Sequence, residues 1–329
     1  MEVVRTQLKG RLQMLKYILN RLFHSAIVMF VISFIVFFIM FKAGDPVQLL
    51  LPPDATQQDV IEMRHALGID QSFIKQYEAF LKNVAKGNLG NSFVYGQPAL
   101  DVVFERLPAT LELSVLAMIF SIIFGVPLGI IASIRPKAWY SKAIMFLSLS
   151  GISVPVFWTG MVLVLVFSVL LGWLPSSGRG EVYLFTSAFT WDGIKHLIMP
   201  VLTLSFFQLA LILRLTRTGM MEVMMQDYIK LATAKGVPRR VVVYYHALKN
   251  SLIPLITVIG IQFGQLVAFT IVTETIFAWP GTGKLIIDSI QNLDRPIVVA
   301  YLLIISFIFV AINFIVDVLY TFVDPRVRV

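Results

Sequence analysis

The hydrophobic residues of this chain collect into six long runs that are separated by polar segments. A helix needs about 20 mostly apolar residues to cross a hydrocarbon core of roughly 30 Å, and most of the runs reach that length. The pattern therefore predicts an all-α polytopic membrane protein with six transmembrane helices. The predicted spans are Leu22–Phe41, Leu111–Ile134, Ala143–Leu171, Ile198–Leu213, Ile253–Phe277 and Val298–Phe322.

Two of these runs depart from a simple span. The third contains the sequence Ser153-Val154-Pro155. Because proline removes a backbone hydrogen bond and bends a helix, we expect one kinked span there rather than two. The fourth run is short, and we expect its helix to begin nearer Trp191.

The composition agrees with a membrane protein. Hydrophobic residues make up 57% of the chain and charged residues only 14%, with a mean hydropathy of +0.82. Soluble domains are nearer half apolar and a quarter charged. The chain has no cysteine, which excludes disulfides and thiolate metal sites. The net charge of +8 is explained by basic cytoplasmic loops, so we expect a lipid membrane and no nucleic acid as partner.

The basic residues also predict the orientation. The segments that are inside when the N-terminus is inside hold 17 Lys and Arg, and the outside segments, which are longer in total, hold 9. This bias follows the positive-inside rule and places both termini in the cytoplasm. The inside segments are 1–21, 135–142, 214–252 and 323–329, and the outside segments are 43–110, 172–197 and 278–297.

The pattern divides the chain into four parts. A cytoplasmic segment, 1–21, leads into the first span, 22–41, and a large external loop, 42–110, precedes a five-span core, 111–329. An elbow at 226–250 belongs to that core.

The external loop has the pattern of a folded lobe. Thr56 followed by Asp59 is an N-cap box, and Gly68 closes a short helix that runs through Leu67. A second helix follows, and the lobe either caps the bundle or forms a docking surface for a soluble partner. The apolar stripe of this helix is Ile74, Tyr77, Phe80, Leu81 and Val84.

The elbow at 226–250 is polar, basic and predicted to be helical. Its first helix ends at Gly236, because glycine accepts the left-handed conformation that closes a helix. Pro238 suits the first turn of the next helix, which starts with Arg239 and Arg240. Two helices joined by a glycine turn form a rigid unit that a soluble motor protein could bind and move. The alternative is an amphipathic loop that lies on lipid headgroups.

The elbow sequence, DYIKLATAKG…HALKNSLIP, resembles the coupling loop of permease subunits in bacterial binding-protein-dependent ABC importers. The general Glu-Ala-Ala-x-x-x-Gly pattern of that loop is degraded here, where Lys230, Leu231 and Ala232 precede Gly236. The form is similar to that of the dipeptide/oligopeptide/nickel permease branch. Matching pieces along the chain are AGDPV at 43–47, ALGID at 66–70, GNLGNSF at 87–93, ERLPATLELS at 105–114, GVPLGIIAS at 125–133, SVPVFWTG at 153–160, TETIFAWPGTGKLIIDSI at 273–290 and NFIVDVLYTFVDPRVR at 313–328.

The resemblance implies the other subunits of an ABC importer. This chain would be the first of two homologous permeases in a bacterial cytoplasmic (inner) membrane. Its partners would be the second permease, two ABC ATPase subunits, an external solute-binding protein and a peptide or peptide-like substrate. The chain would not be an enzyme and would bind no cofactor, since ATP and Mg²⁺ belong to the ATPases. The residues implied in ATPase coupling are Asp227, Tyr228, Ala232, Ala234, Lys235, Gly236, Arg239 and Arg240.

Other sites are not supported by the sequence. Gly281–Lys284 is not a phosphate-binding loop, because position 278 is alanine and Leu285 replaces the required Ser or Thr. No Ser-His-Asp order or carboxylate pair indicates catalysis. No metal site is expected, since the histidines are scattered over both sides of the membrane without ligand spacing. They are His24, His65, His196 and His246.

Polar side chains within spans are costly in lipid and usually face the bundle or a wet cavity. Such residues either line a translocation path or form interhelical hydrogen bonds. Glu112 and Glu274 lie near outer ends, and Asp317 lies near an inner end, where we expect an arginine partner. The candidate path residues are Gln208, Gln262, Gln265 and Asn313, and the pairs Gly125…Gly129 and Gly260…Gly264 predict close helix contacts.

The alternative function is a self-sufficient secondary transporter or channel. It would need paired buried acids or an inverted repeat, and the sequence shows neither. The sequence leaves the substrate open among dipeptides, oligopeptides, opine-like conjugates, glutathione and nickel chelates.

Overall fold

The computed structural model describes residues 2–42, 47, 51, 55–66 and 68–323, and these are helical apart from turns, loops and two isolated bridges. Five apolar stretches are long enough to cross a membrane, or six if one bent helix pair counts as a span. The all-α polytopic prediction is therefore confirmed. The five long helices are α1 (Glu2–Lys42), α5 (Ala99–Ile134), α8 (Trp191–Met224), α11 (Leu248–Phe269) and α14 (Arg295–Val323).

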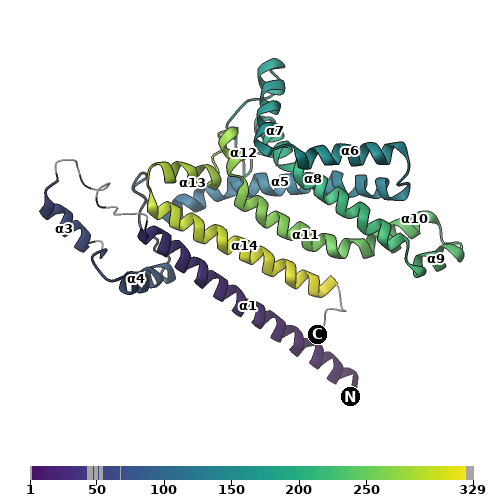
Figure 1. Ribbon diagram of the computed structural model, residues 1–329, viewed down its shortest axis with the longest axis horizontal. Coiled ribbons are helices and arrows are strands. Elements are labelled where there is room, and N and C mark those ends of the chain that lie inside the picture. Colours follow the sequence, from purple (N-terminus) through teal and green to yellow (C-terminus); the bar gives the residue numbers. More distant parts are fainter. Residues whose placement is uncertain (1, 43–46, 48–50, 52–54, 67, 324–329) are drawn as a thin grey trace.

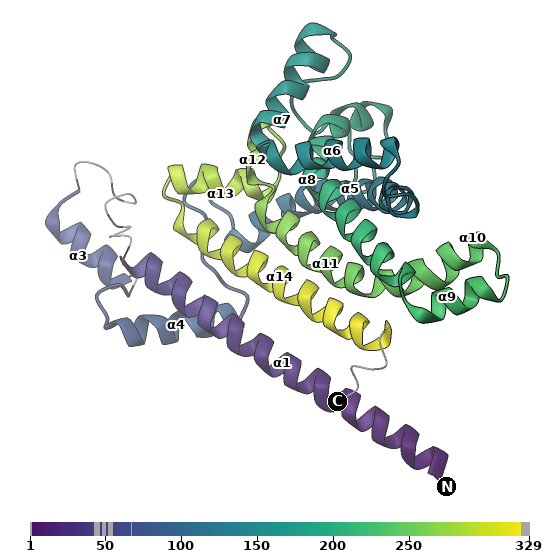
Figure 2. The same cartoon turned by 45° about the vertical axis from the view of Figure 1, so that its right-hand side comes forward.

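The bundle has two distinct ends. The start of α1, the end of α14 and the elbow lie toward one end, and the external lobe lies toward the other (Figures 1 and 2). An even number of spans places the start of the first helix and the end of the last on the same side, as the six-span prediction requires.

The third predicted span is broken rather than kinked. Its two halves are α6 (Trp139–Ser153) and α7 (Val156–Leu163), and α7 is extended by the π-helical turn η1 (Val164–Leu170). The axes of the two halves differ by 103°, and α7 stands across the direction of α6 (Figure 1). The reason is local: Val154 is extended at φ −90° and ψ 128°, the conformation that a residue before proline prefers.

Other helix ends extend past the apolar runs. The fourth span begins at Trp191, as expected, because Thr190 caps it by accepting the Gly193 N–H at 3.0 Å. It then continues to Met224. Similarly, segment 1–21 is part of α1 from Glu2 onward, and α5 begins within the predicted external loop. The added turns of α1 and α8 contain no proline, so these helices propagate through them, whereas α5 continues through Pro108.

Helices α5 and α8 form the most extensive pair in the bundle. At Gly129 an added Cβ would lie 2.7 Å from the Leu213 carbonyl oxygen, so only glycine permits this approach. Gly260 and Gly264 lie directly against side chains of α14, at Val316 and Phe309. Both predicted small-residue pairs therefore make close helix contacts within this chain.

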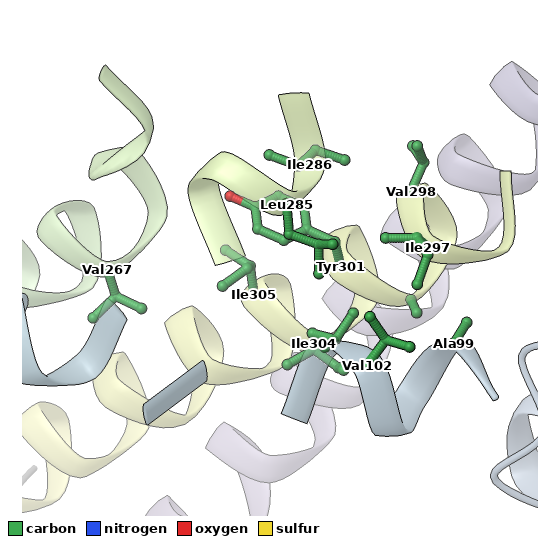
Figure 3. Close-up of a cluster of buried hydrophobic side chains, with 12 residues drawn as sticks. Ala99, Val102, Val267, Leu285, Ile286, Ile297, Val298, Tyr301, Ile304 and Ile305 are labelled. Atoms are coloured by element: carbon green, nitrogen blue, oxygen red, sulfur yellow. The ribbon is translucent and has the colours of Figure 1, made fainter. Parts of the chain in front are cut away.

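A cluster of buried apolar side chains joins α5, α11 and α14 to the short helix α13 (Thr282–Gln291) (Figure 3). In this cluster Leu285 of α13 lies near Tyr301 of α14, and Ile304 of α14 lies near Val102 of α5. The packing fixes α13, and with it the loop between α12 (Ile271–Ile276) and α13, across the end of α5.

The external lobe contains two helices, α3 (Gln57–Ala66) and α4 (Phe73–Ala85). The predicted N-cap box is present, with Thr56 N and Oγ1 both donating to Asp59 Oδ2 at 2.8 Å. Gly68 adopts φ +67° and ends α3 as predicted, while Leu67 lies outside the described residues.

Helix α4 packs on α1 through aromatic rings. The ring of Phe37 lies 5.1 Å from that of Phe80 and 5.3 Å from that of Tyr77. The predicted stripe is corrected at one position: Ile74 is 75% exposed, and Phe73 takes its place against Phe37. Aromatic pairing with α1, which no pattern within α4 reveals, decides which face is covered.

Candidate functional site

The elbow begins with α9 (Asp227–Ala234), directly after α8 (Figure 2). The helix ends in a pair of backbone bonds, from Gly236 N to Thr233 O at 3.0 Å and from Val237 N to Ala232 O at 3.2 Å. These two bonds define a Schellman motif, which requires a left-handed residue. Gly236 supplies it at φ +80°, so the predicted glycine turn is confirmed.

The second helix of the elbow runs without interruption into the fifth span. It starts after Pro238 as α10 (Arg239–Val241), passes through the π-helical turn η2 (Val242–Ala247) and continues as α11. The Pro238 carbonyl accepts the first bonds of this helix, from the N–H groups of Val241 and Val242. The turn and the fifth span are therefore joined by one continuous helix.

A buried cluster ties the elbow to the ends of two other helices. Ile229 is the buried residue of α9, and it packs with side chains from α5, α8 and η2. Arg239 Nη2 also donates to the Ile134 carbonyl at 3.5 Å, at the C-terminal end of α5, where a cation is favoured by the helix dipole. The cluster consists of Ile130, Met220, Ile229, Val242, Val243 and Ala247.

Most of the predicted coupling residues lie on the open side of the elbow. Asp227 forms an exposed ion pair with Lys230 at 2.8 Å, an interaction of little energetic value. Tyr228 is 44% exposed, and its hydroxyl accepts a hydrogen bond from Asn250 at 2.8 Å. Ala232 is half-buried, whereas the exposed members of the set are Asp227, Tyr228, Ala234, Lys235, Gly236, Arg239 and Arg240.

Sequence reasoning missed an apolar component of the same surface. Leu231 is 56% exposed, Tyr244 57% and Tyr245 64%. Residues two apart in a helix do not share a face, so burial of Ile229 forces Leu231 outward. The two-residue spacing of Ile229 and Leu231 was the feature of the sequence that could have predicted this exposed position. We call the exposed set Met225, Tyr228, Leu231, Val241, Tyr244 and Tyr245, with Lys230, Lys235, Arg239 and Arg240, the elbow surface.

The candidate path residues do not form one group. Gln208 is buried, and its Oε1, like that of the half-buried Gln262, has no hydrogen-bond partner among the described residues. Gln265 is exposed on α11. Asn313 instead donates to the Phe309 carbonyl of its own helix at 2.8 Å. It lines a separate cavity of about 490 Å³ between α1, α14 and the end of α11.

The acids near the outer ends are held by hydrogen bonds. Glu274 is fully buried and accepts bonds from Thr110 Oγ1 at 2.7 Å, Thr270 Oγ1 at 2.8 Å and Lys284 N at 2.9 Å. A Cβ at Gly281 would overlap this carboxylate. The glycine loop therefore encloses a carboxyl group of the chain itself.

Histidines and acids do not assemble into a metal site in the part of the chain that the structure describes. His65 pairs with Asp70 at 2.8 Å on the external lobe. Asp317 lies in α14, but its side chain is outside the described residues, so the expected arginine partner stays a prediction.

The profile of the family described as binding-protein-dependent transport system inner membrane component matches residues 125–329. The profile of the N-terminal part of such membrane components matches residues 14–114. This chain belongs to that family.

Three relatives that are 38 or 39% identical in sequence match most of the permease. It is 38% identical to the dipeptide transport system permease protein DppB of Alkalihalophilus pseudofirmus, over 96% of this chain and 100% of the relative. It is 39% identical to the glutathione transport system permease protein GsiC of Escherichia coli K12, over 96% and 99%. The di/tripeptide permease protein DppB of Pseudomonas aeruginosa is 39% identical over 87% of this chain and 90% of the relative.

The fold of the permease also has a solved counterpart. A chain of the MetNI methionine ABC transporter in an inward-facing conformation matches with a TM-score of 0.56 and 16% identity, over 68% of this chain and 96% of the other. At this identity the match shows a shared fold and nothing about substrate.

Proposed function

We propose that this permease is one of two membrane subunits of an ATP-driven importer for peptides or peptide-like solutes. The printed names of its relatives, which are dipeptide, di/tripeptide and glutathione permeases, support this substrate class. The expected partners are a second homologous permease, two ABC ATPases that bind ATP and Mg²⁺, and an external solute-binding protein.

The observation that carries the proposal is the construction of the elbow. Its outer side is exposed, apolar and basic, and its inner side is fixed by Ile229 to the ends of α5 and α8. An exposed patch of this kind is typical of a protein interface rather than of a solvated loop. A partner that closes on the elbow surface would therefore move α5, α8 and α11 together, which is the motion that opens and closes a path between two permeases.

A rigid surface at the opposite end suits a docking partner. The buried carboxylate of Asp294 accepts hydrogen bonds from Ser92 Oγ, from Phe93 N at 3.2 Å and from Val94 N at 3.3 Å. These bonds fix the loop that exposes Phe93, Val94 and Tyr95. We assign this loop and the external lobe to docking of the solute-binding protein.

The direction of the reaction follows from these assignments. The loaded binding protein docks at the lobe end, and ATP closes the two ATPases at the elbow end. The elbow transmits that closure and turns the translocation cavity between the two permeases from inward-facing to outward-facing. Hydrolysis of ATP then resets the cavity. The chain itself performs no bond-breaking step, so we assign it no enzymatic activity and no cofactor. The start of α1 and the end of α14 lie at the elbow end, which we assign to the cytoplasmic side of the bacterial inner membrane.

The elbow is tested by changing its surface without touching its core. Leu231→Asp is expected to abolish transport and ATPase co-purification while the protein still inserts and folds, because Leu231 is exposed and does not belong to the buried cluster of the elbow. Ile61→Asp on α3, with 59% exposure against 56% for Leu231, is the matched control for membrane insertion and ATPase co-purification, both of which it should leave unchanged. Normal transport by Leu231→Asp would show that the elbow surface does not couple.

A second variant tests the turn. Gly236→Val forces a β-branched residue into φ +80° and is expected to impair coupling, whereas Gly236→Asn should be tolerated because asparagine visits this region.

Uptake that survives ATP depletion but collapses with the ion gradient would favour the secondary-transporter alternative instead.

A further inference from the structure

The turn between α5 and α6 carries a cluster of exposed cations. Arg135, Lys137 and Lys142 are all exposed, and the ion pairs of the described residues involve other side chains. The turn is well defined, since Ser141 Oγ and Ala138 N both donate to the Arg135 carbonyl, at 2.7 and 3.0 Å. The three charges are therefore held close together without a negative partner in this part of the structure.

A fourth cation lies at the edge of this turn. Arg239 of the elbow bonds to the Ile134 carbonyl, next to Arg135. Four exposed cationic residues thus lie at or beside the turn where α5 ends and α6 begins. Mutual repulsion in such a cluster is relieved by an anionic ligand.

The exposed face of α6 continues from this cluster. Trp139, Lys142, Phe146 and Leu149 are separated by three or four residues, so they share one face of the helix. Trp139 is 80% exposed, Phe146 71% and Leu149 57%. The face is cationic and aromatic at its first turn and apolar beyond it. This order matches that of a phospholipid, with its charged headgroup followed by acyl chains.

We propose that the α5–α6 turn and this face of α6 bind an anionic phospholipid. Arg135, Lys137 and Lys142 contact the headgroup phosphate, and the acyl chains lie along Phe146 and Leu149. Tryptophan prefers the membrane–water interface, and a lysine next to it can extend its amine to the headgroups. A soluble protein cannot reach Phe146 and Leu149, because they lie farther along a membrane helix. A lipid contacts both parts of the face at once.

The site has a consequence for the elbow. Since Arg239 bonds to the last turn of α5, an anionic headgroup at Arg135 attracts the same guanidinium. The lipid would then hold α10 against the membrane surface. The lipid site itself requires only that the chain lies in a bilayer and does not depend on the proposed transport function.

The test is lipid retention by the purified full chain. The protein is reconstituted in nanodiscs of phosphatidylcholine with a minor share of phosphatidylglycerol, and the lipids that remain after mild detergent extraction are quantified by mass spectrometry. We expect enrichment of phosphatidylglycerol that weakens at high salt. Each cation beside an anionic surface contributes about fivefold, so the triple variant Arg135→Gln, Lys137→Gln, Lys142→Gln should lose at least about tenfold.

The matched control removes three cations from the external lobe, Lys75→Gln, Lys82→Gln and Lys86→Gln, and should retain the lipid as the unchanged chain does. If the triple variant inserts poorly, Lys142→Gln alone should still lose about fivefold. Equal retention of the two lipids, or unchanged retention by the triple variant, would refute the site. If retention is unchanged but ATPase subunits no longer co-purify, the cluster binds a protein, and the transport proposal stands without the lipid site.

Discussion

Glu112 on α5 and Arg179 in the loop before α8 form a buried ion pair, with 2.6 Å between Oε2 and Nη2 and side-chain exposures of 4% and 14%. The other carboxylate oxygen of Glu112 accepts bonds from Thr186 Oγ1 at 2.6 Å and from Ser187 N and Oγ at 2.6 and 2.8 Å. Arg179 also lies over the ring of Trp279, 5.8 Å from its centroid. One glutamate in the bundle therefore fixes a long irregular loop.

The first prediction concerns this ion pair. Glu112→Gln leaves the Arg179 guanidinium buried without its counter-charge, and the loss of one partner of a buried pair is expected to cost about 3 kcal/mol. Limited proteolysis of the loop and thermal unfolding in detergent measure the effect. Glu78→Gln, which breaks an exposed pair with Lys82, should change neither. Unchanged protease resistance of Glu112→Gln would contradict the assigned role.

The second prediction concerns strain in the same loop. Leu184 and Phe185 adopt φ of 50° and 73°, a left-handed conformation that costs residues with a Cβ about 1 kcal/mol each. Their side chains are 66% and 81% exposed, so little burial offsets this cost. Leu184→Gly and Phe185→Gly should each raise the unfolding temperature, whereas Val182→Gly, at a residue with ordinary φ, should lower it. A fall for all three would show that the two exposed side chains stabilise the loop.

The third prediction compares two helical glycines. Gly129→Ala places a Cβ 2.7 Å from both the Leu213 carbonyl and Thr216 Cβ, so α5 and α8 must separate, at a cost of about 2 kcal/mol. Gly219→Ala meets Ser251 Cβ at an ordinary 3.4 Å and should be neutral or stabilising, because alanine favours helix by up to about 1 kcal/mol. Thermal unfolding in detergent distinguishes the two. Equal effects would mean that the α5–α8 contact is looser than described.

The fourth prediction concerns pH at the external lobe. The hydrogen bond with Asp70 raises the pKa of His65 above its usual 6.5, and the same bond lowers the pKa of Asp70 below its usual 3.8. The pair is fully charged between these two usual values. Its contribution disappears as pH rises through the raised pKa of His65 and as pH falls through the lowered pKa of Asp70.

Hydrogen exchange measures this dependence. The Gly68 and Ile69 amides bond to the end of α3 and should exchange faster, after correction for intrinsic rates, as pH rises above the His65 pKa. In His65→Gln this dependence should vanish. A profile that is the same in both proteins would mean that the pair does not hold the turn.

The chain's own pattern was sufficient for much of this architecture. Run length predicted the spans, and the Thr56–Asp59 box, Gly68 and Gly236 predicted where short helices begin and end. These features depend on residues close in sequence, whose backbone preferences act wherever they stand. The elbow was predictable for the same reason, since its Schellman turn involves only residues 232–237.

Tertiary structure alone decided the rest. The preference for Phe73 over Ile74 against α1 and the separation of Asn313 from the glutamines depend on which helices become neighbours. The partners of Glu112, and Thr110 among those of Glu274, lie far away along the chain. A buried carboxylate needs hydrogen-bond donors from whichever segment the fold brings next to it. The sequence around the acid does not predict which segment that is.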